Sequence, residues 1–204
     1  MAPFAKPDRF DPELQTFLEQ ASVRLCQWFA TASNRGPLPA LSALPDVAPP
    51  PQGLSVDALL DDLQLVMEGA YQPSHPGALA HLDPPPLTAS IAADLICAGL
   101  NNNLLAEELS PSLSRLEREM CRWFAERLGL PLTAGGVAAS GGSLSNLMAM
   151  VIARQQADLQ GDPRAVVLAS VDAHVSLAKA IRVMGLASDA LQTVPVDQEG
   201  CMNL

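Results

Sequence analysis

Two apolar runs near the end of the sequence, separated by a helical pattern, constrain the fold more than any other feature. The first, residues 164–170, follows an Asp-Pro turn and contains a short continuous apolar run, typical of a buried strand. The second covers residues 191–196, and residues 175–184 between them carry apolar side chains at helical spacing. Strand, helix and strand in this order predict a βαβ unit with parallel strands, and therefore an α/β fold.

Two strands are too few for a complete domain of this class. Parallel sheets hold about four to six strands and are covered by helices on both faces. Because the sequence reaches residue 204 soon after a turn at Glu199-Gly200, we expect it to be the N-terminal portion of a longer architecture. The alternative is a small complete α/β domain with further strands that the pattern does not reveal.

The N-terminal segment is predicted to form a helix followed by a linker. Residues 11–33 place apolar side chains along one side of a helix, and that stripe must dock on the body or on a second subunit. Residues 34–53 are rich in proline, which favours an extended or irregular path. We therefore expect an N-terminal helix and linker over residues 1–54 and a second domain over residues 55–204.

Further helices are predicted from their start signals. Ser55 is the cap of one helix, and Thr88 begins another. Ser110 is the expected cap of a third helix, with Pro111 at its first position. A fourth helix is expected to start near residue 144 and to run to Gly161.

The composition excludes several classes of partner. A net charge of −10 argues against electrostatic binding to nucleic acid or anionic lipid. No apolar stretch approaches the about 20 residues that span a bilayer, and the N-terminus lacks the layout of a secretory signal. The four cysteines lie far apart without a Cys-x-x-Cys pair, so no zinc site or disulfide framework is expected. We predict a cytoplasmic protein with reduced thiols and no metal, nucleic-acid or membrane partner.

The stretch Ser140-Gly141-Gly142-Ser143 has the pattern of an anion cradle at a helix start. Glycines let the backbone approach a ligand closely, and serine hydroxyls stand where free N–H groups begin a helix. A helix start carries a partial positive charge, so a phosphate fits there without a basic side chain. The alternative is an ordinary Gly-Gly turn with a serine cap.

His174 is the candidate side chain for a ring-shaped ligand. It lies four residues beyond Ser170, the expected carboxyl end of the first strand, where open α/β sheets bind ligands. Together with the Gly-Gly-Ser helix start it would suit a flat, phosphorylated aromatic ligand whose ring stacks on the imidazole. The alternative is a structural histidine with no ligand.

Six motifs occur in order along the sequence, at residues 75–77, 101–103, 110–117, 140–147, 153–154 and 172–180. Taken together they resemble the group II pyridoxal-phosphate-dependent amino-acid decarboxylases. That family includes the aromatic-amino-acid, glutamate, histidine and diaminobutyrate decarboxylases. The Gly-Gly-Ser-x-x-Asn-Leu version found here is more similar to the glutamate and diaminobutyrate branch than to the aromatic branch.

The resemblance implies a fold type I, transferase-like architecture that is incomplete here, with a helical N-terminal segment and the first part of the large-domain parallel sheet. Residues 55–204 would be the N-terminal part of the domain that binds pyridoxal 5′-phosphate, and the full-length protein would be a homodimer. Gly142 and Ser143 match the positions that hold the cofactor phosphate. His174 matches the imidazole that stacks on the pyridine ring and assists catalysis, and His75 falls where the family borders the substrate entrance.

The resemblance also implies α-decarboxylation of an L-amino acid. The family carries its Schiff-base lysine and the carboxylate partner of the pyridine nitrogen further along the chain, beyond Leu204. Of the two lysines here, Lys6 lies in a proline-rich tail and Lys179 matches a family lysine with another role. We therefore expect these 204 residues alone to lack decarboxylase activity. Glu117 and Arg154 match recurrent positions, and we expect them to serve packing first.

Other functions stay open at this point. A different fold type I lyase, such as a carbon–carbon lyase or a desulfurase, would share these motifs. A non-catalytic interaction or dimerisation fragment would use the apolar stripe on residues 11–33. A serine hydrolase built on Ser140 or Ser143 has less support, because the Gly-x-Ser-x-Gly elbow and a partner histidine are missing.

Overall fold

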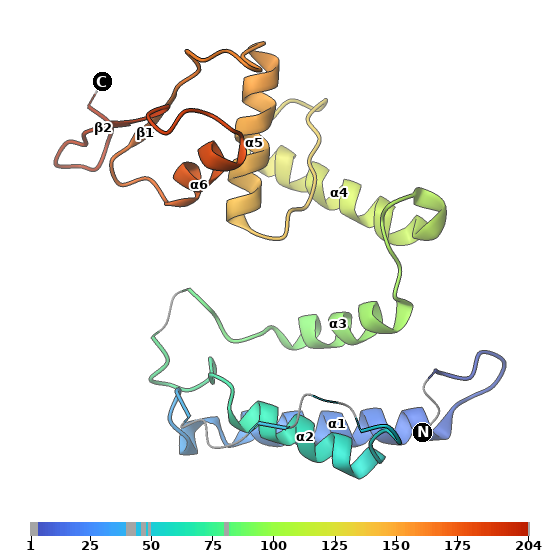
Figure 1. Cartoon of the computed structure of the whole chain (residues 1–204). Coiled ribbons are helices and arrows are strands. Elements are labelled where there is room, and N and C mark those ends of the chain that lie inside the picture. The colour runs from blue at the N-terminus through green and yellow to red at the C-terminus, as the bar shows by residue number, and fades with distance from the viewer. Residues whose placement is uncertain (1–3, 40–43, 46–47, 49, 80–81, 204) are drawn as a thin grey trace. The chain divides into compact units, whose positions relative to one another are not determined.

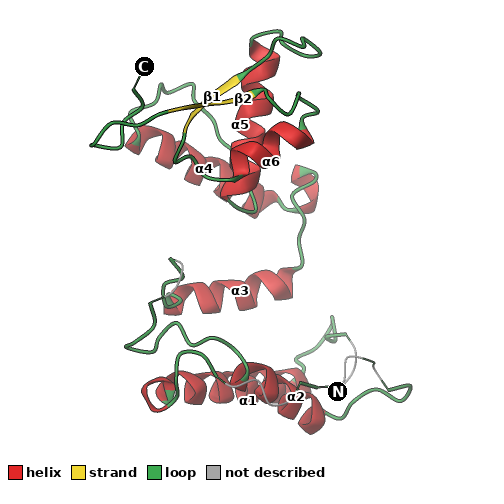
Figure 2. Ribbon diagram, turned by 60° about the vertical axis from the view of Figure 1, so that its left-hand side comes forward, coloured by secondary structure: helices red, strands yellow, loops and turns green. Residues whose placement is uncertain are grey.

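The computed structural model describes residues 4–39, 44–45, 48, 50–79 and 82–203. These residues form two compact units, Met1–Asn101 and Asn102–Leu204. The first unit is helical and the second holds the sheet (Figures 1 and 2). The boundary that we expect after residue 54 separates domains of the family, and the division into compact units does not test it. It therefore stays a prediction. No helix in the described ranges is both long and apolar enough to cross a membrane.

The described residues of the first unit form three α-helices and one short 3-10 helix. They are α1 (Pro12–Ala30), η1 (Ala32–Asn34), α2 (Val56–Glu68) and α3 (Thr88–Leu100). The Ser55 hydroxyl accepts a hydrogen bond from the Ala58 N–H at 3.1 Å, so the predicted cap of α2 is confirmed. α3 ends at Asn101, whose φ of 46° is a left-handed conformation that asparagine tolerates.

α1 and α2 lie side by side in both views (Figures 1 and 2). Leu60 of α2 is only 1% exposed, which makes it the most deeply buried apolar side chain among the described residues. Arg24 of α1 donates to the Leu60 carbonyl oxygen and to the Asp61 carboxylate, each at 3.0 Å. Because an exposed ion pair adds little stability, we expect burial of Leu60 to contribute more to the stability of this unit than the Arg24–Asp61 pair.

The second unit contains the remaining elements. They are η2 (Glu107–Leu109), α4 (Pro111–Arg127), α5 (Gly142–Gln156), β1 (Val167–Ser170), α6 (Ser176–Val183) and β2 (Leu191–Val194). Arg118 of α4 binds the Glu107 carboxylate through two nitrogens, at 2.9 and 3.2 Å. This hydrogen-bonded charge holds the pKa of Glu107 below its usual range.

β1 and β2 pair in parallel, from Val167 opposite Leu191 to Ser170 opposite Val194. α6 connects them in sequence and packs on α5 (Figure 2). The predicted βαβ unit is therefore confirmed. Most of the buried apolar side chains in this unit are small, which lets helix and sheet approach closely. They are Ala125, Ala165, Ala169, Ala180 and Ala190, and Ile181 is the larger exception among the described residues.

Ser110 occupies the N-cap position of α4 as predicted, but its side chain does not cap the helix. Its hydroxyl is buried and has no hydrogen-bond partner among the described residues. At φ −156° and ψ 65° the residue lies outside the extended region from which a cap hydroxyl reaches the first N–H groups. The start of α4 therefore depends on Pro111, whose fixed φ suits the first helical position.

Several predicted elements are shorter than expected, among them β1, which begins at Val167 instead of residue 164. α5 ends at Gln156 and does not reach Gly161, because Asp158 takes a left-handed conformation with φ 53°. β2 ends at Val194, directly before Pro195.

Leu60→Ala is expected to destabilise the first unit by about 2–5 kcal/mol, because it leaves a cavity at a fully buried position. Urea unfolding measures this change. Trp28 on α1 serves as the fluorescent probe in a Trp123→Phe background, since the chain has only two tryptophans.

Leu63→Ala on the same helix is the matched control. Leu63 is 41% exposed, and we expect its truncation to cost less than about 1 kcal/mol. Equal losses in the two variants would contradict the packing described for Leu60.

Candidate functional site

The start of α5 presents unpaired backbone donors. Gly141 is the N-cap, and no side chain caps the helix. Within the part of the chain that the structure describes, the N–H groups of Gly142 and Ser143 have no acceptor. The first turn carries no acidic residue, so the protein does not neutralise the partial positive charge of the helix start.

Both glycines border open space. A Cβ atom built on Gly141 or Gly142 would meet no heavy atom within 4 Å. An anionic oxygen can therefore approach this backbone closely. The alternative of a serine-capped turn is not what the structure contains, because the Ser145 hydroxyl donates to the Gly141 carbonyl at 3.3 Å instead of capping the helix.

His174 is positioned by the turn that leaves β1. The Asp172 N–H donates to the Ser170 hydroxyl at 3.1 Å, and the Ala173 N–H donates to the Ser170 carbonyl at 3.0 Å. The His174 carbonyl then accepts the Leu177 N–H at 3.1 Å, which begins α6. The imidazole is exposed at the carboxyl end of the strand, the edge where open α/β sheets bind ligands.

Two polar side chains join the helix start to this imidazole. The Asn146 side-chain amide lies 2.8 Å from the Ser176 hydroxyl, and that hydroxyl lies 2.8 Å from Nδ1 of His174. Asn146 follows Gly142 by four residues and Ser143 by three, so all three lie on one face of α5. The structure thus brings Gly142, Ser143 and His174 to the same side of the second unit.

Sequence reasoning gave no role to Asn146 or Ser176, although both lie inside the motifs. Their signal was spacing: Asn146 stands one helical turn after Gly142, and Ser176 stands two residues after His174. Ser176 is only 1% exposed, which no pattern in the sequence indicates.

Glu117 and Arg154 hold the framework around the site. The Glu117 carboxylate of α4 accepts the Ala138 N–H at 3.2 Å, which fixes the loop that leads into Gly141. Arg154 of α5 donates to the Met184 carbonyl at 3.0 Å, just past the end of α6. These contacts agree with the packing roles expected for both residues.

The other candidate residues lie elsewhere or lack partners. His75 belongs to the first unit, where its Nδ1 accepts the Gly77 N–H at 2.9 Å. In the described part of the chain, the side-chain hydroxyl that is hydrogen-bonded to His174 belongs to Ser176 and not to Ser140 or Ser143, so the hydrolase alternative gains no support. Lys179 is an exposed residue of α6. The described ranges also contain no group of three or more side chains able to hold a metal ion.

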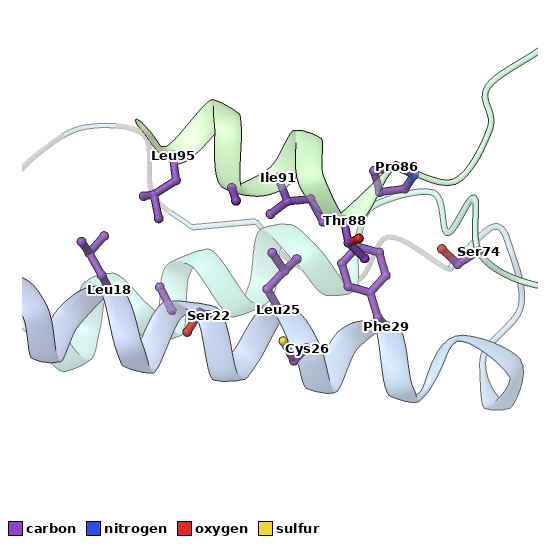
Figure 3. A pocket seen from close by; sticks show the side chains of 12 residues that line it. Leu18, Ser22, Leu25, Cys26, Phe29, Ser74, Pro86, Thr88, Ile91 and Leu95 are labelled. Atoms are coloured by element: carbon purple, nitrogen blue, oxygen red, sulfur yellow. The ribbon is translucent and has the colours of Figure 1, made fainter. Parts of the chain in front are cut away.

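A separate cavity of about 740 Å³ lies within the first unit, between α1 and α3 (Figure 3). Leu25 and Phe29 of α1 face Ile91 and Leu95 of α3 across it. Its walls are mostly apolar, and no acidic, basic or imidazole side chain is among the described residues that line it.

Known proteins resemble this chain in both sequence and fold. Residues 39–204 match the pyridoxal-dependent decarboxylase conserved domain. The chain is 30% identical over 171 residues to an L-2,4-diaminobutyrate decarboxylase of Rhizobium meliloti (strain 1021), covering 83% of this chain and 34% of that protein. It is 26% identical over 193 residues to a cysteine sulfinic acid decarboxylase of Mus musculus, covering 89% of this chain and 37% of that protein.

A solved structure has the same fold. The glutamate decarboxylase domain of the diaminobutyrate-pyruvate transaminase and L-2,4-diaminobutyrate decarboxylase from Vibrio parahaemolyticus superposes with a TM-score of 0.86 at 22% identity. The match covers 98% of this chain and 47% of that one. The second unit is therefore part of a fold type I domain, as predicted.

The chain belongs to the pyridoxal-dependent decarboxylase family. It spans about a third of the length of the curated relatives that it matches. The family and the partial α/β architecture expected from the motifs are both confirmed.

Glu117→Ala is expected to speed hydrogen exchange of the Ala138 amide about five-fold, because one hydrogen bond that holds this N–H is lost. Amide exchange followed by NMR measures the rate. Glu119→Ala on the same helix is the control and should leave Ala138 unchanged. An unchanged rate in Glu117→Ala would contradict the anchoring of this loop.

Proposed function

We propose that this chain supplies the phosphate-binding and ring-binding residues of a pyridoxal-phosphate-dependent L-amino-acid decarboxylase. One observation carries the proposal: the contact between Asn146 and Ser176 joins an uncapped helix start to an exposed imidazole. Membership of the family supports the same chemistry. The activity itself is part of the proposal, because the chain spans only about a third of its curated relatives.

The residues at the start of α5 fit a phosphate group. The N–H groups of Gly142 and Ser143 would donate to phosphate oxygens, and the Ser143 hydroxyl would add a third donor. The open space beside Gly141 and Gly142 supports this assignment.

His174 would lie against the face of the cofactor ring and hold its orientation. When bound, the cofactor supplies the electron sink for loss of CO₂ from the amino acid. This chain's residues would bind the phosphate and align the ring, which is the contribution of a protein in cofactor-dependent catalysis.

The substrate we propose is an L-amino acid of the kind used by the glutamate and diaminobutyrate branch. The Gly-Gly-Ser-x-x-Asn-Leu motif and the printed names of the relatives support this choice. His75 stays our candidate for the substrate side. We also propose a cytoplasmic location, supported by four cysteines that are all unpaired.

Binding is tested with pyridoxine 5′-phosphate, which carries the ring and phosphate but has no aldehyde to react with lysines. We expect the chain to bind it, with inorganic phosphate as a competitor. Gly142→Val should weaken binding about ten-fold or more, because its side chain fills the space that the phosphate needs. Titration calorimetry measures the affinity.

Gly135→Val is the matched control for this substitution. A Cβ atom at Gly135 also meets no heavy atom within 4 Å, but the residue lies outside the helix start. Equal weakening by both variants, or no binding by the unchanged chain, would refute the phosphate site.

Catalysis is tested in a longer protein that contains this segment together with the family's lysine. We expect release of labelled CO₂ from carboxyl-labelled L-glutamate or L-2,4-diaminobutyrate. His174→Ala should slow turnover more than it weakens cofactor binding. A product formed without CO₂ would favour another lyase reaction.

We further propose that the protein forms a homodimer through the apolar cavity between α1 and α3. Leu95 lines this cavity and is 53% exposed. An exposed apolar side chain in such a cavity is stabilised when a partner covers it. The apolar stripe of α1 also needs a surface that covers it. We propose that a second copy of the chain provides this surface.

Sedimentation equilibrium tests the dimer, which should have twice the mass of one chain. Leu95→Glu should shift the equilibrium to monomer, because it places a charge in the apolar contact. Ile96→Glu is the control, since Ile96 is 61% exposed on the same helix but does not line the cavity. A monomer at every concentration, or equal effects of both variants, would exclude this interface.

A further inference from the structure

The hydrogen bonds around His174 define which ring nitrogen carries the proton. The backbone N–H of Ser176 donates to Nδ1 of His174 at 3.2 Å. A backbone N–H is always a donor, so Nδ1 must be an acceptor without a proton. In the neutral imidazole the proton therefore lies on Nε2.

The Ser176 side chain reinforces this arrangement. Its hydroxyl lies 2.8 Å from the same Nδ1, and an unprotonated nitrogen requires the hydroxyl to be the donor. The hydroxyl oxygen is then free to accept from the Asn146 amide, which also lies at 2.8 Å. Asn146, Ser176 and His174 thus form a chain of hydrogen bonds that runs from the amide to the hydroxyl and from the hydroxyl to Nδ1.

The Ser176 hydroxyl, in the middle of this chain, is sheltered from water. Ser176 is 1% exposed and Asn146 is half-buried. A buried hydroxyl that loses its partner is costly, so the three groups hold one another in a single pattern. Solvent does not provide a ready substitute for either contact of the Ser176 hydroxyl.

We propose that Ser176 and Asn146 are positioning residues that fix the tautomer and the orientation of the His174 ring. They turn Nδ1 toward the protein and leave the Nε2–H as the donor that the ring offers to a bound molecule. A histidine held in this way donates a hydrogen bond to an anionic oxygen rather than accepting a proton at that nitrogen. The use of this donor in catalysis rests on the proposed function, whereas the tautomer does not.

The tautomer is measured by ¹⁵N NMR of the imidazole in the full chain, without cofactor and at a pH where the ring is neutral. A His75→Gln/His81→Gln background leaves His174 as the only histidine, since the chain has three. We expect Nε2 to resonate in the protonated range and Nδ1 in the unprotonated range.

Three substitutions separate positioning from a general structural effect. Ser176→Ala removes the side-chain donor and should lower the ratio of the Nε2–H to the Nδ1–H tautomer about five-fold. Ser176→Thr keeps a hydroxyl and should restore the ratio. Asn146→Asp replaces the donor amide by an acceptor carboxylate, which draws the Ser176 hydroxyl proton away from Nδ1 and should also shift the ratio toward Nδ1–H.

Ser145→Ala is the control, because Ser145 lies next to Asn146 on α5 and its hydroxyl donates to the Gly141 carbonyl, away from Ser176. Circular dichroism checks that each variant is folded. A wild-type ring protonated at Nδ1, or a ratio unchanged in both Ser176→Ala and Asn146→Asp, would overturn the proposal. An equal shift in Ser145→Ala would overturn it as well.

A second measurement keeps this inference distinct from the proposed function. Addition of pyridoxine 5′-phosphate should move the His174 ring signals if the ring lies against the cofactor. If the tautomer is as expected but these signals do not move, the ring-binding role fails while the positioning role stands.

Discussion

The contact between Asn146 and Ser176 is the interaction on which the candidate site depends. The two side chains lie 30 residues apart in sequence and 2.8 Å apart in space. One belongs to the helix whose first N–H groups are free, and the other begins the helix that follows the exposed imidazole. This bond therefore links the uncapped helix start to the segment that carries His174.

A second bond at the other end of the same helices fixes their relative direction. Arg154 and Met184 are also 30 residues apart, and they join late α5 to the end of α6. Since the starts of both helices meet as well, α5 and α6 run side by side in the same direction. Small buried residues such as Ala180 permit the close approach of the two helices.

The differences between sequence and structure arise where local signals compete with tertiary packing. Ser110 has the side chain of a helix cap, but it is buried with a backbone conformation that prevents capping. The apolar pattern beyond α5 continues past Gln156, although the helix stops, because a left-handed Asp158 turns the chain toward β1. In contrast, Ser55 caps α2 as predicted, because its surroundings are exposed and only local geometry decides the bond.

The sequence by itself determined the order of the elements, the parallel pairing expected of the βαβ unit, and the residue types at the helix start and after β1. These features follow from local spacing and from the period of apolar side chains. Only the tertiary structure decided that Asn146 meets Ser176, that Nδ1 of His174 faces the protein, and that Ser176 is shielded from water. The physical reason is that a hydrogen bond across 30 residues depends on how two helices pack, and packing has no local signature in the chain.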